Sequence, residues 1–395
     1  MVAKPTINML DGVNVALGVT GSIAAVRGVE LIHELQRHGA SVRVVTSPAA
    51  ADIINPWALE FASGHQVVER LTGAVEHIEL CGTSGWADVF VVAPATANTV
   101  GKVAHAIDDT PVTTCATTAI GSGIPLVIAP AMHEPMYDHP GVVENLERLR
   151  SRYDVTIVDP RLEEGKAKIA EDEAIVIDTA RATGDRPLEG RRIAVTSGPT
   201  HEMIDPVRMI STRASGRTGQ AVAKALYIRG AEVELIRAEG DSVTYATVHQ
   251  ARSASDMEVI ALDLIEDGID AYVSAAAIGD YSVEPTSQKL PSGETRTLDL
   301  SSTPKVIRSV REAAPSLPIV GFKAESTEDD TSLEAAGREL LEAHQLTFVV
   351  ANHVSVMGAD EARILVLDES STESFEGSKD EVADTIADRI ADSLR

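Results

Sequence analysis

Glycine and hydroxyl residues follow predicted strands at three places in the first half of the chain. The candidate binding residues of these three turns, with their neighbours, are Gly21, Ser22, Ile23, Ser47, Thr96, Ala97 and Asn98. Free N–H groups and hydroxyls at the start of a helix suit a phosphate group. The spacing around Gly21 is not the Gly-x-Gly-x-x-Gly of dinucleotide-binding proteins, and taken alone a plain tight strand-to-helix turn is an equally good interpretation.

Methionine, histidine and tyrosine side chains gather in a proline-bounded loop. Residues 130–137 read Pro-Ala-Met-His-Glu-Pro-Met-Tyr, which places His133 and Met136 directly after an apolar strand. A single histidine in such a loop is more often solvated or satisfied by a neighbour than catalytic. Ligands of α/β proteins bind at the carboxyl edge of the sheet, so we expect this loop and the hydroxyl-rich turns to converge there.

The second half carries a hydroxyl-rich turn followed by a glycine-rich one. Residues 196–200 read Thr-Ser-Gly-Pro-Thr after a strand, and residues 215–219 read Ser-Gly-Arg-Thr-Gly before a helix. A helix N-terminus with a guanidinium beside it is a second candidate anion site. A glycine-rich turn for a nicotinamide nucleotide is the alternative interpretation.

Short β-rich apolar runs alternate with stretches of helical period, which is typical of βαβ units with buried parallel sheets. Strands are predicted over residues 13–20, 41–46, 87–93, 125–129, 155–158, 192–196, 232–236, 271–275, 318–321, 347–350 and 363–367. Helices are predicted over residues 22–37, 95–106, 141–150, 216–229, 255–267, 304–312, 333–344 and 379–393. Both periods fail between residues 181 and 191, so we expect two different doubly wound α/β domains, residues 1–183 and 188–395.

Length and charge set limits on partners. A chain of 395 residues favours two domains, and 34 basic against 60 acidic residues give a net charge of -26. A negative field of this size repels nucleic acid and anionic membranes, so neither is an expected partner. The basic residues are 9 Lys and 25 Arg, a lysine-poor acidic balance that predicts a salt-adapted archaeal source, with an ordinary acidic protein as the alternative.

Cysteine usage and the lack of a long apolar segment predict a cytoplasmic protein. Cys81 and Cys115 are the two cysteines of the chain, too few for a disulfide framework or a four-cysteine metal site. Cys81 lies four residues after His77, but both cysteines are best interpreted as buried small residues. No protein metal site is predicted.

The motifs of the first half resemble the FMN-dependent cysteine decarboxylases, specifically the phosphopantothenoylcysteine decarboxylase family. The resemblance rests on residues 21–25, 77–80, 94–99 and 130–137. It implies a flavodoxin-like, Rossmann-like domain in which the residues of the three turns named above bind FMN and His77 is the catalytic base. It also implies substrate contacts from His133, Met136 and Lys168. A thiol lacks an electron sink for loss of carbon dioxide, and flavin supplies one by oxidising the thiol to a thioaldehyde.

Two departures from this family concern the substrate. His133 stands where the family has Asn, which adds a titratable group. The flap residues Glu164 to Glu171 resemble the segment that follows the family's Ala-Cys-Gly, but the cysteine that donates a proton is absent. Lys166, Lys168 and Tyr137 stay open as alternative donors.

The second half resembles phosphopantothenate-cysteine ligases over essentially its whole length. The resemblance rests on residues 196–200, 204–208, 274–281, 303–305, 321–325 and 350–352. It implies a Rossmann-like domain that activates a carboxylate with CTP and Mg²⁺, forming an acyl-cytidylate that cysteine attacks. The residues implied are Lys289 as the catalytic lysine and, for the nucleotide, Ala276, Asp280, Lys289, Pro304, Lys305, Val306, Ile307, Phe322, Arg338 and His344.

The ligase resemblance also has departures. Thr212 stands where the family has the Asn that supports conversion of the acyl-cytidylate. Two lysines of the late helix are replaced by Leu340 and His344, and Arg338 is close enough along the chain to substitute for one.

The two resemblances together predict one bifunctional enzyme of coenzyme A synthesis. The second domain would condense 4'-phosphopantothenate with cysteine, and the first would decarboxylate the product to 4'-phosphopantetheine. A flavin-binding regulatory subunit and a nicotinamide-dependent oxidoreductase are the competing hypotheses. The resemblance further implies a homo-oligomer, with trimeric contacts of the decarboxylase domain and dimeric contacts of the ligase domain.

Overall fold

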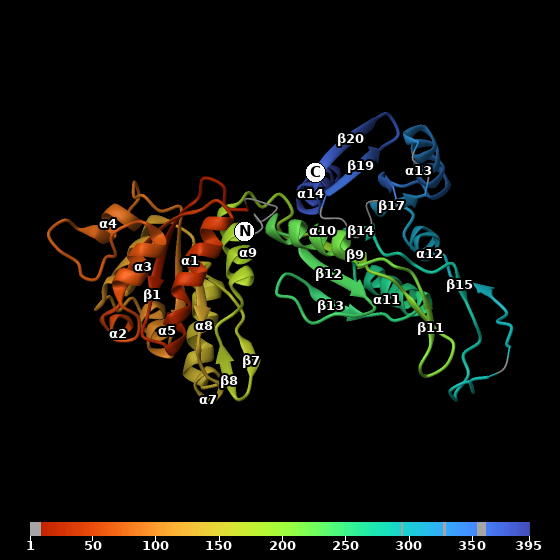
Figure 1. The fold of residues 1–395 in the computed structure, drawn as a ribbon. Helices are drawn as coiled ribbons and strands as arrows, with labels where there is room; N and C mark the ends of the chain where they lie inside the picture. The colour runs from red at the N-terminus through yellow and green to blue at the C-terminus, as the bar shows by residue number, and fades with distance from the viewer. Residues whose placement is uncertain (1–8, 294, 327–328, 354–360) are drawn as a thin grey trace. The chain divides into compact units, whose positions relative to one another are not determined.

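A computed structural model describes residues 9–293, 295–326, 329–353 and 361–395 of the chain (Figure 1). The chain divides into two compact units, Met1–Asp185 and Arg186–Arg395. Each unit has its own sheet and its own hydrophobic core. Within the described ranges, no helix combines the length and apolar character needed to cross a bilayer.

The first unit is built on a five-stranded parallel sheet. Its strands are β1 (Asn14–Val19), β2 (Ser41–Thr46), β3 (Val89–Ala95), β4 (Leu126–Pro130) and β6 (Thr156–Ile157). Their order is β2-β1-β3-β4-β6, the flavodoxin-like order. Every residue of β3 and β4 is buried, because helices cover both faces of a parallel sheet.

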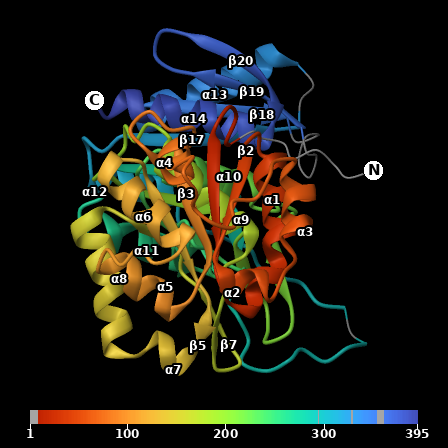
Figure 2. The same cartoon turned by 90° about the vertical axis from the view of Figure 1, so that its left-hand side faces the viewer.

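Ten helical segments accompany this sheet. They are η1 (Ile23–Arg27, a 3-10 helix), α1 (Gly28–Arg37), α2 (Pro48–Ala51), α3 (Pro56–Ser63), α4 (Glu76–Cys81), α5 (Ala97–Ala104), α6 (Pro111–Ser122), α7 (Glu134–Tyr137), α8 (Pro140–Tyr153) and α9 (Asp172–Thr183) among the described residues. Figure 2 shows α1 and α3 on one side of the sheet and α5, α6 and α8 on the other. Leu31, Ile32 and Leu35 form the buried stripe of α1.

A small antiparallel sheet extends from the first unit. Its order is β5-β8-β7, formed by β5 (Met132–His133), β7 (Arg161–Glu163) and β8 (Lys166–Lys168). Glu164 and Gly165, with φ of 52° and 70°, make the two-residue turn between β7 and β8. His133 lies opposite Lys166 in the register, so the flap is paired with the loop that follows β4.

The second unit is built on an eight-stranded sheet in the order β13-β12-β9-β14-β17-β18-β19-β20. The first six of these strands are parallel and have Rossmann order, and the last two are antiparallel. Their bounds are β9 (Arg192–Ser197), β12 (Glu232–Arg237), β13 (Thr247–Gln250), β14 (Ala271–Ser274), β17 (Ile319–Glu325), β18 (Phe348–His353), β19 (Glu361–Leu367) and β20 (Thr372–Ser378).

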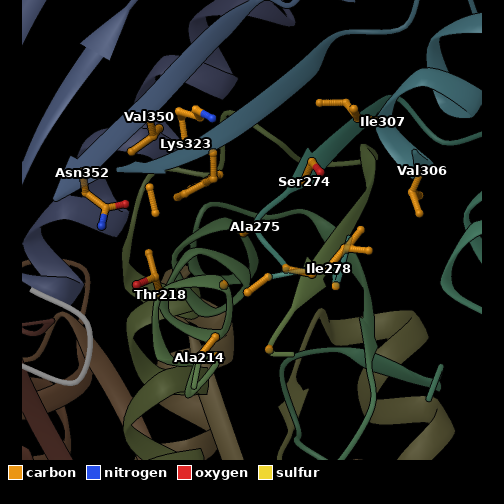
Figure 3. Close-up of a pocket in the computed structure, with 18 of the residues that line it drawn as sticks. Ala214, Thr218, Ser274, Ala275, Ile278, Val306, Ile307, Lys323, Val350 and Asn352 are labelled. Atoms are coloured by element: carbon orange, nitrogen blue, oxygen red, sulfur yellow. The ribbon is translucent and has the colours of Figure 1, made fainter. Parts of the chain in front are cut away.

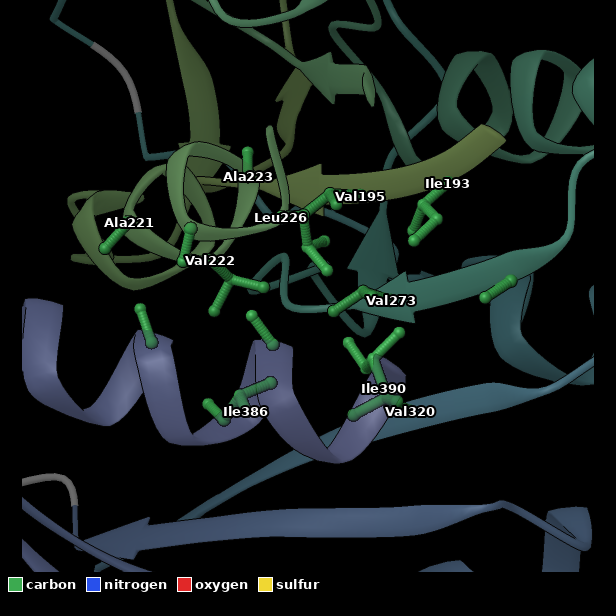
Figure 4. Packing of buried hydrophobic residues seen from close by; sticks show 14 of the residues in the cluster. Ile193, Val195, Ala221, Val222, Ala223, Leu226, Val273, Val320, Ile386 and Ile390 are labelled. Carbon is green, nitrogen blue, oxygen red and sulfur yellow. The ribbon is translucent and has the colours of Figure 1, made fainter. Parts of the chain in front are cut away.

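Helices cover this sheet on both faces. They are α10 (Arg217–Ile228), α11 (Ala254–Glu266), α12 (Val306–Ala313), α13 (Asp330–His344) and α14 (Lys379–Ser393). Figure 4 shows Leu226 of α10 facing α14 and its Ile386 and Ile390, with Val195 of the sheet close by. These four side chains are 0 or 1% exposed, so the core fixes α10, and with it the glycine-rich turn that precedes it.

Two short antiparallel pairs lie beyond the main sheet. They are β10 (His201–Met203) with β11 (Met209–Ser211), and β15 (Tyr281–Ser282) with β16 (Ser301–Ser302). The amide of Thr286 donates to the carbonyl of Ile204 at 3.0 Å, which ties the segment after β15 to the β10–β11 turn.

The structure confirms the predicted fold class and each of the predicted strands, which became β1, β2, β3, β4, β6, β9, β12, β14, β17, β18 and β19. The single helix expected over residues 22–37 was wrong in its first turn, which is the 3-10 helix η1. The sequence missed α6, because small and hydroxyl-bearing residues make up most of it and its buried face differs little in polarity from its exposed face. It also missed the hairpins, whose strands of two or three residues are too short to alternate visibly.

Candidate active sites

Three short turns of the first unit end in side-chain caps at the carboxyl edge of the sheet. Ser22, Ser47 and Thr96 precede η1, α2 and α5, and each hydroxyl accepts a backbone N–H two or three residues ahead at 3.3 to 3.4 Å. A capped helix start holds its remaining N–H groups in fixed directions. Because β1, β2 and β3 are adjacent and parallel, these three starts lie at one edge.

Hydrogen bonds join the loops after β1 and β4 to each other and to the end of β3. The Thr20 hydroxyl donates to the Pro94 carbonyl at 2.7 Å, and the Ser22 hydroxyl donates to the Ala131 carbonyl at 3.4 Å. The amide of Ala131 donates to the carbonyl of Ala95 at 2.9 Å. The predicted convergence of the hydroxyl-rich turns with the loop of residues 130–137 is therefore present.

Gly21 is required by crowding in the turn after β1. A Cβ on Gly21 would lie 2.5 Å from the Cβ of Ala49, a separation that real Cβ atoms do not show. Glycine at this position therefore lets the turn after β1 pack directly on the first residues of α2. The adjoining Ile23 is 79% exposed, which leaves an apolar surface next to this polar cradle.

His77 lies on α4 and is half-buried. Its Nδ1 atom is buried and has no hydrogen-bond partner among the described residues. Leu80 and Cys81 at the end of the same helix are buried in the core and hold α4 in place. A buried ring nitrogen without a partner is costly, and such groups gather at sites that a ligand completes.

Both cysteines are fully buried, which confirms that they are small core residues. Hydrogen bonding to Cys115 and then burial raise the pKa of the Cys81 thiol far above its usual range. Because its thiol is fully buried in the core, Cys81 does not take the place of the missing flap cysteine.

The candidate proton donors lie around the flap. The ammonium of Lys168 is 2.9 Å from Glu164 and 3.0 Å from Glu163, and hydrogen bonds to these two carboxylates raise its pKa. Burial and then the charge of Asp159 raise the pKa of Tyr137. Both shifts stabilise the protonated forms. His133 and Met136 are exposed beside them.

The second unit contains a cavity of about 400 Å³ (Figure 3). It lies at the carboxyl ends of β9, β14, β17 and β18, the edge where doubly wound sheets bind ligands. Seven of the predicted nucleotide residues line it, namely Ala276, Asp280, Pro304, Lys305, Val306, Ile307 and Phe322.

Glycines let the floor of this cavity come close to the strands. Gly216 has φ of 73°, and a Cβ there would lie 3.0 Å from Gly198, while a Cβ on Gly219 would lie 2.7 Å from the hydroxyl of Ser197. That hydroxyl donates to the Gly216 carbonyl at 2.8 Å. The first turn of α10 is thereby held against the end of β9, with its N–H groups toward the cavity region.

Cationic side chains line the cavity as well. Lys305 forms an ion pair with Asp280, and Lys323 lies 2.9 Å from Glu325. Lys379 and Asn352 also line it, and the sequence assigned neither a role. For Lys379 the available signal was Ser378 with Glu381, a capping box that marks the start of α14.

Four predicted ligase residues do not line the cavity. Thr212 lies closest, since its hydroxyl donates to the carbonyl of the lining residue Ala277 at 3.4 Å. Arg338 instead contacts Glu334 of its own helix and Thr372 of β20. Burial and the nearby arginines lower the pKa of His344. Lys289 lies in the exposed segment after β15.

Asp205 positions the segment that carries Lys289. It is 1% exposed, and its carboxylate accepts the amides of Val207 and Arg208 at 2.8 Å and that of Leu290 at 3.1 Å. Burial acts to raise the pKa of Asp205, but these hydrogen bonds outweigh it and hold the pKa below its usual range. The residue next to Lys289 is thus pinned to the β10–β11 turn.

Protein side chains in the described ranges form no cluster of three or more metal-ligating residues.

Comparisons with known proteins support the same division of the chain. Residues 4–183 match the family model Flavoprotein, and residues 188–394 match the DNA/pantothenate metabolism flavoprotein C-terminal domain. The chain is 43% identical to the coenzyme A biosynthesis bifunctional protein CoaBC of Thermococcus kodakarensis, over 91% of this chain and 89% of that protein. The corresponding protein of Methanocaldococcus jannaschii is 35% identical over 95% and 93%.

Solved structures resemble single units. The crystal structure of the C-terminal domain of a coenzyme A biosynthesis bifunctional protein CoaBC is 27% identical with a TM-score of 0.45, covering 53% of this chain and 98% of that one. The structure of a PPC decarboxylase mutant with pantothenoylaminoethenethiol is 30% identical with a TM-score of 0.35, covering 42% and 94%. The extent of the sequence matches shows that this chain belongs to the family of bifunctional coenzyme A biosynthesis proteins.

Proposed function

We propose that the second unit joins 4'-phosphopantothenate to cysteine with CTP and that the first unit decarboxylates the product to 4'-phosphopantetheine. Membership in the bifunctional family supports both activities. The observation that carries the assignment of the ligase site is the cavity in which seven predicted nucleotide residues meet.

The residues of the first unit fit an FMN phosphate. The cradle around Gly21 admits no side chain, and Ser22, Ser47 and Thr96 hold three helix starts at one edge. A phosphate there would accept backbone N–H groups, and Ile23 and the loop of residues 96–98 would contact the ring. When bound, the flavin supplies the electron sink that a thiol lacks.

His77 is the proposed base of the decarboxylase. Its buried Nδ1 has no partner in the part of the chain that the structure describes, so the ring can orient on a ligand rather than on those residues. An imidazole removes a proton near neutral pH because its ordinary pKa lies there. Lys168, held by Glu163 and Glu164, and Tyr137 both keep their protons at neutral pH, and together with Lys166 they are the candidate donors of the proton that the missing flap cysteine would have given.

In the ligase, anionic phosphates would lie on the start of α10 and near Lys305 and Lys323. These groups would stabilise the charge that develops as a carboxylate attacks the α-phosphorus and pyrophosphate leaves. Lys289 would approach from the segment pinned by Asp205. Mg²⁺ would be carried mainly by the phosphates, as this ion usually is.

We also propose that the protein is cytoplasmic and that it self-associates through its first unit. Trp57 and Phe61 on α3 are 79% and 88% exposed, one helical turn apart, and Ile23 is 79% exposed. Exposed large apolar side chains one turn apart, as Trp57 and Phe61 are, favour contact with another protein surface. We propose that a second copy of the first unit covers them.

Turnover of the whole chain tests the proposal. With phosphopantothenate, cysteine, CTP and Mg²⁺, the chain is expected to release CMP and pyrophosphate, and FMN-loaded chain is expected to release carbon dioxide from phosphopantothenoylcysteine. Flavin bound without carbon dioxide release would favour a regulatory subunit. NADPH binding without pyrophosphate release would favour an oxidoreductase.

A further inference from the structure

Two segments of the second unit form walls of the nucleotide cavity, namely residues 275–280 after β14 and residues 303–307 at the start of α12 (Figure 3). The two segments are joined where β15 pairs with β16, with Tyr281 opposite Ser302. The main-chain pairing continues by one step, because the amide of Thr303 donates to the carbonyl of Asp280 at 3.1 Å. The spacing between the two walls is therefore set beside Asp280 and Thr303.

Thr303 also holds the first wall through its side chain. The residue is 7% exposed, and its hydroxyl donates to the carbonyl of Gly279 at 2.5 Å. The amide of the same glycine donates to the hydroxyl of Thr200 at 2.9 Å, and Thr200 is fully buried. Threonine hydroxyls thus bind both backbone polar groups of Gly279. Because both threonines are buried, water does not compete for these hydrogen bonds.

Other contacts fix the same loop to β9. The amide of Ala276 donates to the hydroxyl of the buried Thr196 at 3.2 Å, and the amide of Ala277 donates to the carbonyl of Gly198 at 2.9 Å. The hydroxyl of Thr303 differs from these partners, since it comes from the segment that continues into the opposite wall. Its loss would leave the loop attached to β9 and would remove a contact between the two walls.

We propose that Thr303, together with Thr200, is a positioning residue that fixes the distance between these walls and so selects the nucleotide that fits the cavity. The inference rests on the proposed function of the second unit, and it adds the side chains that favour a pyrimidine nucleotide over a purine nucleotide. A purine has two fused rings, so walls held at a fixed spacing exclude it by steric overlap. Buried, close-packed walls do not give way to a larger ligand at low cost.

The relative affinity of the chain for CTP and ATP tests the proposal. Equilibrium dialysis of the whole chain with each radiolabelled nucleotide and Mg²⁺ gives this ratio without the need for turnover. The unchanged chain should bind CTP at least about tenfold more tightly than ATP. Thr303→Val keeps the shape of the side chain but removes the hydroxyl, and it should lower the ratio about tenfold by weakening the binding of CTP and not that of ATP.

Three further variants separate positioning from a loss of stability. Thr303→Ser keeps the hydroxyl and should restore the ratio to within about threefold of that of the unchanged chain. Thr200→Val frees the amide of Gly279 and should lower the ratio as Thr303→Val does. Thr347→Val is the matched control, because the hydroxyl of Thr347 accepts the amide of Ile319 at the opposite, amino edge of the sheet. Its ratio should not change.

Two results would overturn the proposal. One is an unchanged chain that binds CTP and ATP equally, and the other is a Thr303→Val variant that melts at a lower temperature but keeps the ratio. Thermal melting shows whether each variant folds, and Thr200→Val decides the point if Thr303→Val does not. A chain that binds CTP selectively but releases no pyrophosphate contradicts the proposed ligase function instead, and the ratios of the variants still decide the role of Thr303.

Discussion

The two units build their anion-binding turns from different devices. In the first, Gly21 is required by the approach of Ala49, and hydroxyl side chains cap the three helix starts. In the second, Gly216 has φ of 73° and begins α10 with no side-chain cap, so the crowded backbone of Ser197 and Gly198 holds it instead.

The two units also differ in how far one chain encloses the candidate site. Close backbone packing in the second unit encloses a cavity of about 400 Å³. The capped turns of the first unit lie beside exposed side chains, namely Ile23, His133 and Met136. Glycine contacts occur in both units, but among the described residues only in the second do two glycines, Gly216 and Gly219, pack on the end of the same strand beside an enclosed cavity. We therefore expect only the first site to depend on a second copy of the chain.

The largest effect is expected at His77. Changing His77→Asn should slow carbon dioxide release about a thousandfold, because the base is lost, while flavin absorbance and ligation stay unchanged. His33→Asn on the exposed side of α1 is the control. Equal loss of both activities would show that His77 is structural and that the two sites do not act separately.

The next effect is expected at Gly21. The methyl group of Gly21→Ala would meet Ala49, and the required shift of the turn should weaken FMN binding about a hundredfold. Flavin titration measures this. Gly121→Ala in α6, where a Cβ meets nothing within 4 Å, should bind FMN normally. Normal flavin affinity in Gly21→Ala removes this turn from the site.

A variant of Lys289 tests the ligase activity separately from the decarboxylase activity. Lys289→Gln should lower ligase turnover between about tenfold and a hundredfold, because a cation near the developing phosphate charge is lost. Carbon dioxide release should not change. The exposed Arg308→Gln serves as the matched loss of charge. An unaffected ligase would place Lys289 outside the site.

Alanine variants of Gly216 and Gly268 distinguish the stability cost of crowding from that of backbone strain. Gly216→Ala adds a Cβ at positive φ and 3.0 Å from Gly198, and should cost about 1 to 3 kcal/mol of stability along with weaker CTP binding. Gly268 has φ of 87° but open space around it, so Gly268→Ala should cost only the strain, about 1 kcal/mol. Thermal melting compares them, and equal costs would mean that crowding plays no part.

The smallest effect is the pH dependence that Asp205 gives. The folded pKa is lowered, so its contribution is complete above the unfolded pKa of about 3.9 and is lost as the pH falls through the folded value. Asp205→Asn should therefore lower the melting temperature by a constant amount above about pH 5, and the difference should shrink below about pH 4. A difference that stays constant to pH 2 would contradict this.

The central strands were predictable because they are short, apolar and buried on both faces, as in β3 and β4. The flap hairpin was not, since a two-residue strand such as β5 has no period to read. For the site, chain order placed residues 274–280 at the carboxyl end of β14, whereas residues 303–307 were assigned by the family resemblance and not by their place in a sheet. Lys379 was missed because its strand-to-helix junction lies at the far end of the chain.

The sequence by itself determined the two α/β domains, the family and the turns that start at Gly21 and Gly216, because local spacing encodes strands, caps and close approaches. Only the tertiary structure decided which side chains share a space. Arg338 contacts Glu334 and Thr372 rather than the cavity, while Lys379, absent from every motif, lines it. Burial and partnership depend on which distant segments pack together, and no spacing along the chain records that.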